Sequence, residues 1–252
     1  MAEQRRNVAF GAGASMNESA DISIIIPVLD DSEPLAALIA KIRAMRTQPR
    51  EIIVVDGGDD GELGELAARY GCTRLHARIG RGNQLHAGAL RASGAAIWFL
   101  HADAEPAPDA IDRIANALSA GAIGGFFSFR FSGPRAWYKS LLAALVNWRS
   151  AIGVPYGDQG LFILRAVYDD IGGFADVPLF EEVAFVAAAR KAGRFERIDA
   201  PLGVSPRRWE RDGWLRRTLQ NRTLALAHAA GVSPSRLAQR YPSTSARESA
   251  EC

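Results

Sequence analysis

The chain has 252 residues, of which 48% are hydrophobic, and a formal net charge of +2 at pH 7. That length and apolar content suffice for one full hydrophobic core, as a single large domain or as one domain with an appendage. The net charge is too small to attract nucleic acid by its field alone, although 27 of the 30 basic residues are arginines. We therefore expect a globular protein that binds no nucleic acid.

The two ends of the chain are expected to be disordered tails, at 1–20 and 243–252, around one domain at 21–242. The apolar stretch at 8–14 is too short for the hydrophobic region of a signal peptide. No uninterrupted apolar run reaches the length that spans a bilayer. The two cysteines lie in unlike surroundings, which predicts no disulfide and fits a reducing, cytoplasmic location.

The first hundred residues alternate apolar strands with helices. Residues 22–27 form a β-branched run closed by Pro27, which is typical of a buried parallel strand that reaches its loop. The repeated strand-loop-helix unit predicts a mostly parallel sheet of the nucleotide-binding kind. The further elements expected in this half are helices at 33–46, 62–70 and 82–93, and strands at 51–56, 73–76 and 96–101.

Beyond Pro108 the pattern changes, because an expected helix is followed by an alternating stretch at 126–131 that suits a strand with one covered face. No internal repeat or linker interrupts the second half, so we treat it as part of the same domain. Its remaining expected elements are a helix at 137–154, a strand at 161–164, a helix from 181, a helix at 212–230 and a short helix after 233.

The helix expected at 137–154 is the nearest approach to a membrane segment. It contains Lys139, Asn147 and Arg149, and its apolar side chains gather on one side. Two interpretations stay open. The helix either packs on the body of the protein or makes a contact with a membrane surface or a second copy of the chain.

His101 and Asp103 are the most informative residues of the sequence, because they end an apolar strand at a spacing of i, i+2. An extended backbone would turn both side chains to one face. Open α/β sheets bind ligands at the carboxyl ends of their strands. A carboxylate there can hold a divalent ion that also binds a diphosphate. His101 is either a second metal ligand or a structural hydrogen-bonding group.

Asp56 and Arg81 are weaker candidates. Asp56 ends the strand at 51–56 before a glycine-rich turn and can accept hydrogen bonds from a base or ribose, although Asp-Gly turns after strands are common. Arg81 lies at the start of a helix, where backbone amides and an arginine can receive an anion. A plain capped helix explains Arg81 as well.

Two charged groups in the second half also allow two interpretations. Glu181 and Glu182 begin a helix, where the helix dipole favours acids, yet a carboxylate held near a reaction centre is what a general base requires. Arg207 and Arg208 can pair with phosphate oxygens while Trp209 offers a stacking face. A solvated basic pair beside a core tryptophan fits the same residues.

Eight sequence blocks occur in order between about residues 22 and 242: IIIPVLDD, EIIVVDGGDDG, GRGNQLHAGALRASG, WFLHADAEP, YGDQGLFI, IGGF, PLFEEVAF and SPRRW. Together they resemble a family 2 glycosyltransferase of the GT-A fold. The resemblance is greatest to the bacterial subgroup named for arsenosugar biosynthesis, also called radical-SAM/selenodomain-associated transferases. It implies an α/β fold with a mostly parallel central sheet flanked by helices, and further helices at the C-terminal end.

The resemblance also implies an activity. It is a metal-dependent, inverting transfer of a sugar from a UDP- or GDP-sugar to an acceptor that the sequence does not identify, with Mn²⁺ or Mg²⁺. One alternative is an impaired nucleotide-sugar-binding or regulatory protein on the same fold. A nucleotidyltransferase would need a glycine-rich phosphate loop after the first strand, and Val28-Leu29-Asp30-Asp31 is no such loop.

The resemblance assigns roles residue by residue. Glu182 matches the second acid of the family's acidic pair and would be the base, with Glu181 beside it. Asp103 matches the last acid of the metal-binding motif and would hold the metal, with His101 as the second ligand. The other assignments are donor contacts at Pro27, Asp56, Asp60, Arg81, His101, Asp103, Arg207, Arg208 and Trp209, and acceptor-side positions at Asp158 and Gln159.

Several positions depart from the family pattern, and Glu182 is the most serious because an aspartate is usual there. One extra methylene moves a base by about an ångström, and misplacement of that order can cost roughly a hundredfold in rate. Asp30 and Asp31 also replace an Asn-Glu pair, and His86 replaces an asparagine. The substitution at Glu182 favours the impaired alternative.

Overall fold

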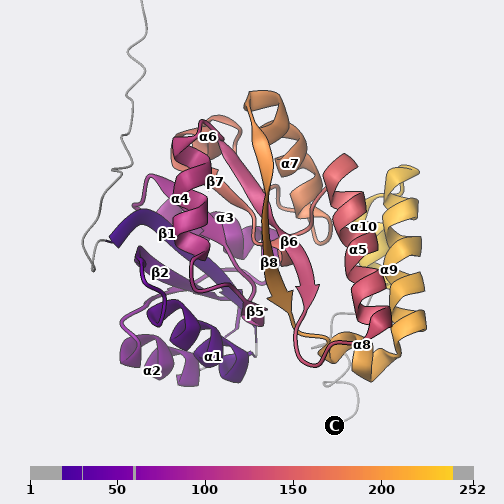
Figure 1. Cartoon of the computed structure of the whole chain (residues 1–252), viewed down its shortest axis with the longest axis horizontal. Coiled ribbons are helices and arrows are strands. Elements are labelled where there is room, and N and C mark those ends of the chain that lie inside the picture. Colours follow the sequence, from indigo (N-terminus) through magenta and orange to yellow (C-terminus); the bar gives the residue numbers. More distant parts are fainter. Residues whose placement is uncertain (1–18, 30, 59–60, 241–252) are drawn as a thin grey trace, which may run out of the picture.

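The computed structural model describes residues 19–29, 31–58 and 61–240. Its strands form one eight-stranded sheet in the order β3-β2-β1-β4-β7-β6-β8-β5 (Figure 1). They are β1 (Ser19–Val28), β2 (Gln48–Asp56), β3 (Thr73–His76), β4 (Ala96–Phe99), β5 (Ala104–Glu105), β6 (Gly124–Phe131), β7 (Phe162–Leu164) and β8 (Phe195–Val204).

The expected mostly parallel sheet is confirmed. The strands from β3 to β4 pair in parallel, and β6 pairs with β8 in the same way. The short strand β7 is antiparallel to both β4 and β6 and joins these two halves, and β5 is antiparallel to β8 at the edge. The carboxyl ends of β1, β2 and β4 consequently lie at one edge of the sheet, where the sequence places its candidate residues.

Helices flank the sheet, and a further group of helices lies on one side, beyond β6 and β8 (Figure 1). None of those in the described part of the chain is long and apolar enough to cross a membrane. They are α1 (Ser32–Arg43), α2 (Gly61–Arg69), α3 (Arg81–Arg91), α4 (Ala110–Ser119), α5 (Trp137–Ile152), α6 (Arg165–Asp170), α7 (Glu181–Ala192), α8 (Arg207–Asp212), α9 (Trp214–Ala229) and α10 (Pro234–Arg240), with a 3₁₀ turn, η1 (Gly157–Gln159).

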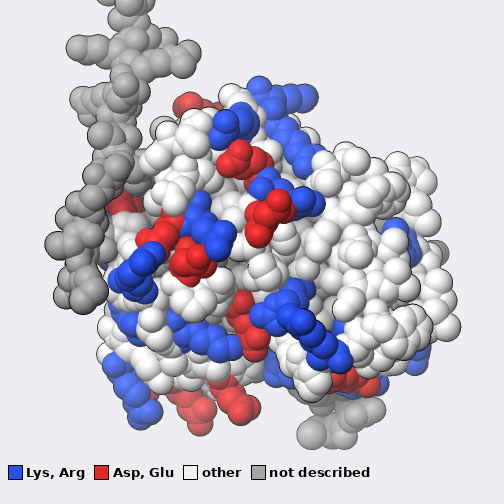
Figure 2. All heavy atoms as spheres, viewed as in Figure 1, with Lys and Arg blue, Asp and Glu red and all other residues white. Residues whose placement is uncertain are grey.

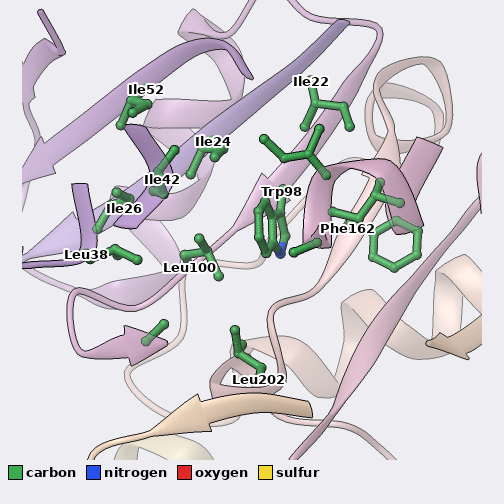
Figure 3. Close-up of a cluster of buried hydrophobic side chains, with 14 of the residues drawn as sticks. Ile22, Ile24, Ile26, Leu38, Ile42, Ile52, Trp98, Leu100, Phe162 and Leu202 are labelled. Carbon is green, nitrogen blue, oxygen red and sulfur yellow. The ribbon is translucent and has the colours of Figure 1, made fainter. Parts of the chain in front are cut away.

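Alternate residues of β1 enter two separate hydrophobic clusters. Ile22, Ile24 and Ile26 belong to the cluster completed by α1 and α4, while Ile25 belongs to the one completed by α3 and α7. Trp98 of β4 lies among the isoleucines of the first cluster (Figure 3). A strand buried on both faces has no polar face, which is why the second half of β1, from Ile24 to Val28, is an apolar run in the sequence.

Strand β8 was not among the elements expected from the sequence. This strand carries charged residues and Pro201, and its pairing with β6 shifts register between Phe127 and Ser128, so that Ile198 and Pro201 are successive partners. A bulge tolerates a proline and interrupts the alternation that would otherwise indicate a strand. A second difference is that β1 begins at Ser19, inside the tail expected at 1–20. Residues 1–18 and 241–252 lie outside the described residues, so the predicted tails and domain boundaries stay predictions.

Candidate functional site

Asp56 ends β2 and is almost completely buried, with 1% of its surface exposed. One carboxylate oxygen accepts the N–H of Gly58 at 2.8 Å, and the other accepts two hydrogen bonds from Arg74 of β3, at 3.2 and 2.5 Å. Pro27 of β1 lies beside the end of β2, because it is in register with Val55, the residue before Asp56. The structure thus holds Asp56 rigidly at the sheet edge, while Asp60 lies outside the described residues.

His101 and Asp103 do not continue the strand as expected, because β4 ends at Phe99. The backbone turns instead, and the N–H of Ala104 donates to the carbonyl of His101 at 3.0 Å. The prediction that an extended backbone directs both side chains to one face was therefore wrong. Burial raises the pKa of Asp103 and lowers that of His101, and the charge of Arg208 acts on both, so the turn keeps both residues within its electrostatic reach.

His101 and Glu182 meet at the backbone of Gly157, in η1. Glu182 is buried and accepts the N–H of Gly157 at 2.9 Å. A Cβ atom at Gly157 would lie 2.7 Å from His101 Nε2 and 2.8 Å from Glu182 Oε1. The turn after β4 and the start of α7, about eighty residues apart in the sequence, therefore both approach Gly157, where a larger residue would force one or both side chains to move. Burial first, and then Arg81 and Arg208, hold the pKa of His101 well below 6.5, which keeps the imidazole neutral.

Glu181, the neighbour of Glu182, is also buried and faces Arg81 at the start of α3. The distance between Arg81 Nη1 and Glu181 Oε1 is 3.8 Å, too long for a hydrogen bond. Burial, and then the charge of Glu182, raise the pKa of Glu181 to about 7, against the opposing effect of Arg81. Phe180 precedes the pair with φ of 61°, a left-handed conformation that is strained for a bulky residue.

Asp158 follows Gly157 and belongs to the same charged group. Burial raises its pKa to about 6, with Arg149 opposing the shift and Glu182 adding to it. Its buried Oδ1 has no hydrogen-bond partner among the described residues. Gln159 behaves differently, since it is fully buried, accepts a hydrogen bond from Ser150 at 2.6 Å and donates to the carbonyl of Phe127 at 3.2 Å. These hydrogen bonds hold η1 in place, and the acceptor-side role of Gln159 stays a prediction.

The expected phosphate-binding element lies in α8. Arg207 is exposed, lies 3.5 Å from Asp31 and lines a cleft together with Asp103. Loss of hydration on burial, and then the positive charge of Arg81, lower the pKa of Arg208. Trp209 instead packs edge-on against Phe131, with ring centroids 5.0 Å apart. The alternative of a core tryptophan beside a basic pair therefore describes Trp209 better than a stacking face does.

The side chains available here suit a divalent metal ion that is held partly by the protein and partly by the phosphates of the substrate. No group of three or more His, Cys, Asp or Glu side chains that could hold a metal occurs within the described ranges. Asp103 is a single carboxylate whose pKa is raised by burial, while Arg208 and Arg207 oppose that shift. Mg²⁺ is commonly held by one or two carboxylates together with substrate phosphates. Asp103 with the neutral imidazole of His101 fits that mode and does not fit a metal cage made of protein alone.

Two residues near the site, Arg149 and His228, were not expected there from the sequence. Arg149 appeared only as an interruption of an apolar helix, yet its guanidinium lies 4.0 Å from the ring centroid of Tyr156, beside Asp158. His228 of α9 stacks on Phe180 with centroids 4.5 Å apart. No local signal distinguishes these residues, because their proximity depends on how α5 and α9 pack.

Comparison with known proteins places the chain in a family. The sequence profile described as Glycosyl transferase family 2 matches residues 23–178. The chain is 28% identical over 160 residues to an undecaprenyl-phosphate 4-deoxy-4-formamido-L-arabinose transferase of Serratia proteamaculans, which covers 58% of this chain and 48% of that protein. It is 32% identical over 112 residues to an uncharacterized glycosyltransferase of Mycobacterium tuberculosis, covering 41% and 42% of the two chains. The chain thus spans about half the length of these relatives.

Solved structures agree on the fold. A mannosyltransferase of Pyrobaculum calidifontis, in complex with GDP-Man and Mn²⁺, superposes with a TM-score of 0.60 at 21% identity, over 86% of this chain and 66% of that one. Glucosyl-3-phosphoglycerate synthase of M. tuberculosis gives 0.58 at 18% identity, over 84% and 78%. The mostly parallel sheet flanked by helices matches the fold of these neighbours, and the chain belongs to glycosyl transferase family 2.

Proposed function

We propose that the chain transfers a sugar from a nucleotide-diphospho-sugar to an acceptor hydroxyl with inversion, and that Glu182 is the base. The observation that carries this proposal is the close approach of both Glu182 and His101 to Gly157. It brings the proposed base next to the turn proposed for the donor diphosphate. Glu182 is buried, so it presents its carboxylate in a site from which water is largely excluded.

In the proposed reaction Glu182 takes the proton of the acceptor hydroxyl, whose oxygen attacks the anomeric carbon of the sugar. The bond from that carbon to the diphosphate breaks, and the nucleoside diphosphate leaves. Arg81 and Arg208 place positive charge beside this position and stabilise the charge that develops on the leaving group. A divalent ion, Mn²⁺ or Mg²⁺, held by Asp103 and His101, would supply further neutralisation of the diphosphate when bound.

The donor class is supported by solved neighbours, one of which was crystallised with GDP-Man and Mn²⁺ and another with UDP-Glc and Mn²⁺. We therefore propose a UDP- or GDP-sugar, with Asp56 on the nucleobase and the basic pair of α8 near the diphosphate. The acceptor stays unassigned. The relation to the arsenosugar subgroup and the cytoplasmic location are also proposals, the latter testable by fractionation of the native cells.

Substitution of Glu182 tests the proposed base. Glu182→Gln keeps the shape and the hydrogen bond to Gly157 but removes the proton acceptor, so single-turnover transfer should fall by at least a hundredfold while donor affinity stays within a few-fold. Glu65→Gln, on the exposed side of α2, is the matched control and should be neutral. Transfer at the wild-type rate by Glu182→Gln would remove Glu182 as the base.

The impaired alternative has one supporting observation, since an oxygen of Glu182 is already occupied by the N–H of Gly157. Glu182→Asp distinguishes the two possibilities. A slower aspartate variant means that the longer side chain is tuned to this site. A much faster one means that the wild-type residue impairs the chemistry and that the chain serves chiefly to bind the nucleotide sugar.

A further inference from the structure

Helices α5 and α9 expose an unusually apolar surface on the side of the molecule away from β1 (Figure 1). Trp137 is 79% exposed, Trp148 64% and Leu215 75%. Large exposed patches of this kind mark contact sites in soluble proteins. We call it the α5–α9 face, and its large exposed apolar residues are Trp137, Tyr138, Leu141, Leu145, Trp148, Ile152, Leu215, Leu219 and Leu226.

The exposed residues of α5 form a continuous stripe. Trp137, Leu141, Leu145, Trp148 and Ile152 recur at spacings of three and four, which places them on one side of a helix. The other side of α5 already packs on the body of the protein, through Leu142, Ala143 and Val146 against the cluster that contains Phe129 and Phe131. The core therefore accounts for only one of the two apolar sides.

The two helices also enclose a cleft of about 570 Å³. A cleft with this lining can take a hydrocarbon chain but offers almost nothing to a polar ligand. The residues that line it are Trp137, Tyr138, Leu141, Leu142, Trp214, Leu215 and Thr218.

The charged residues of α5 and α9 themselves are all basic, and Glu210 of α8 pairs with Lys139 at one end of α5. The sequence contains no Asp or Glu in 133–157 or in 213–240. Arg135, Arg216 and Arg222 are exposed, and no ion pair is formed by any of them within the described residues. Figure 2 shows the surface over α5 and α9 as mostly uncharged, with scattered basic side chains. Exposed tryptophans, leucines and arginines without acids are the composition of an interfacial membrane contact.

We propose that the α5–α9 face docks the protein on an anionic lipid surface. A second copy of the chain would bring the same two acid-free helices with their exposed arginines into contact, and like charges would oppose that pairing. Anionic headgroups complement the arginines instead, while the stripe of α5 enters the boundary between headgroups and acyl chains. The cleft then takes part of one hydrocarbon chain.

Docking through this face would hold the candidate site beside the membrane. Ser150 of α5 donates to Gln159 in η1, next to the turn that contacts Glu182. His228 of α9 stacks on Phe180, which precedes Glu181. Both helices of the face are therefore in direct contact with the segments that carry the site.

Vesicle binding of the full chain tests the proposal, with neither donor nor metal present, so the result is independent of the proposed transfer. Phosphatidylcholine vesicles that contain phosphatidylglycerol should bind the protein and shift the tryptophan emission to the blue, and brominated lipids should quench it. Vesicles of pure phosphatidylcholine should bind the protein at least tenfold more weakly. High salt should weaken binding to the anionic vesicles, because it screens their attraction for the arginines.

Two variants and a control make the test specific. Trp137→Gln/Leu141→Gln/Trp148→Gln should lose at least tenfold in vesicle affinity, because one large side chain removed from water is worth that factor. Arg216→Glu/Arg222→Glu should lose the preference for anionic vesicles. Ile79→Gln/Leu90→Gln, which changes side chains 63% and 66% exposed outside the face, should stay within twofold of the wild type.

Three results would overturn the proposal: no binding to any vesicle, equal binding by the triple variant, or a wild-type dimer in sedimentation that the triple variant abolishes. The last would assign the face to a second copy of the chain. Unchanged circular dichroism and melting temperature confirm that each variant is folded, as expected for exposed substitutions.

Discussion

Gly157→Ala should damage the site while leaving the fold intact. The added Cβ would meet His101 Nε2 at 2.7 Å and Glu182 Oε1 at 2.8 Å. Ordinary contact between such atoms begins near 3.4 Å, so each side chain must retreat by roughly 0.7 Å. The two groups that move are the proposed base, which accepts the N–H of Gly157, and the proposed second metal ligand.

The magnitude follows from that displacement. A shift approaching 1 Å at a reacting group can cost about a hundredfold, so we expect transfer to fall between tenfold and a hundredfold. Overpacking of this kind typically costs about 1–3 kcal/mol of stability. Single-turnover kinetics with saturating donor measure the first effect, and thermal unfolding measures the second.

Gly61→Ala is the matched control, because a Cβ at Gly61 meets nothing within 4 Å. The control should keep the wild-type rate and be as stable as the wild type or slightly more so, by up to about 1 kcal/mol. If Gly157→Ala transferred sugar at the wild-type rate, the close approach of His101 and Glu182 would have no part in the reaction, and the account of the site would fail.

Two further predictions concern buried charge. Folded Glu181 has a pKa raised from 4.5 to about 7, so its contribution to stability is greatest below pH 4.5 and is lost as the pH rises through 7. Glu181→Gln should therefore raise the melting temperature at pH 8 and change it little at pH 4, and equal effects at the two pH values would contradict this. Arg74→Ala leaves the buried carboxylate of Asp56 without its arginine and should cost about 3 kcal/mol in urea unfolding. Arg50→Ala, from the exposed pair with Asp21, should cost less than about 1 kcal/mol, and similar costs for the two variants would refute the argument.

The sequence predicted the parallel half of the fold well because its strands carry strong local signals. In β1 and β2, unbroken β-branched runs end in Pro27 and Asp56, and both the strands and their order along the chain followed from that pattern. In β8 the pairing depends on a bulge and on its partner β6, so no local pattern could reveal it. Strands whose register is set by distant partners are the ones that a single sequence conceals.

The residues of the candidate site also differ in whether a local sequence signal predicted them. Asp56, His101 and Asp103 were recognisable because each follows the end of a strong strand. Gly157 and the Arg149–Tyr156 pair were not, since their role arises from where α5 and η1 pack against the start of α7. Trp209 illustrates the opposite case, in which a motif suggested a stacking face and the ring instead packs on Phe131.

Binding and turnover of a panel of UDP- and GDP-sugars is the most direct test of the central claim. The assay compares Mn²⁺, Mg²⁺ and a chelator, for the wild type and for Asp103→Asn, which should melt no lower because burial already disfavours the Asp103 charge. The account predicts that one donor binds and is slowly hydrolysed only with metal, and that Asp103→Asn abolishes this dependence together with the turnover. Turnover that survives both the chelator and Asp103→Asn, or the absence of binding by every donor, would contradict it.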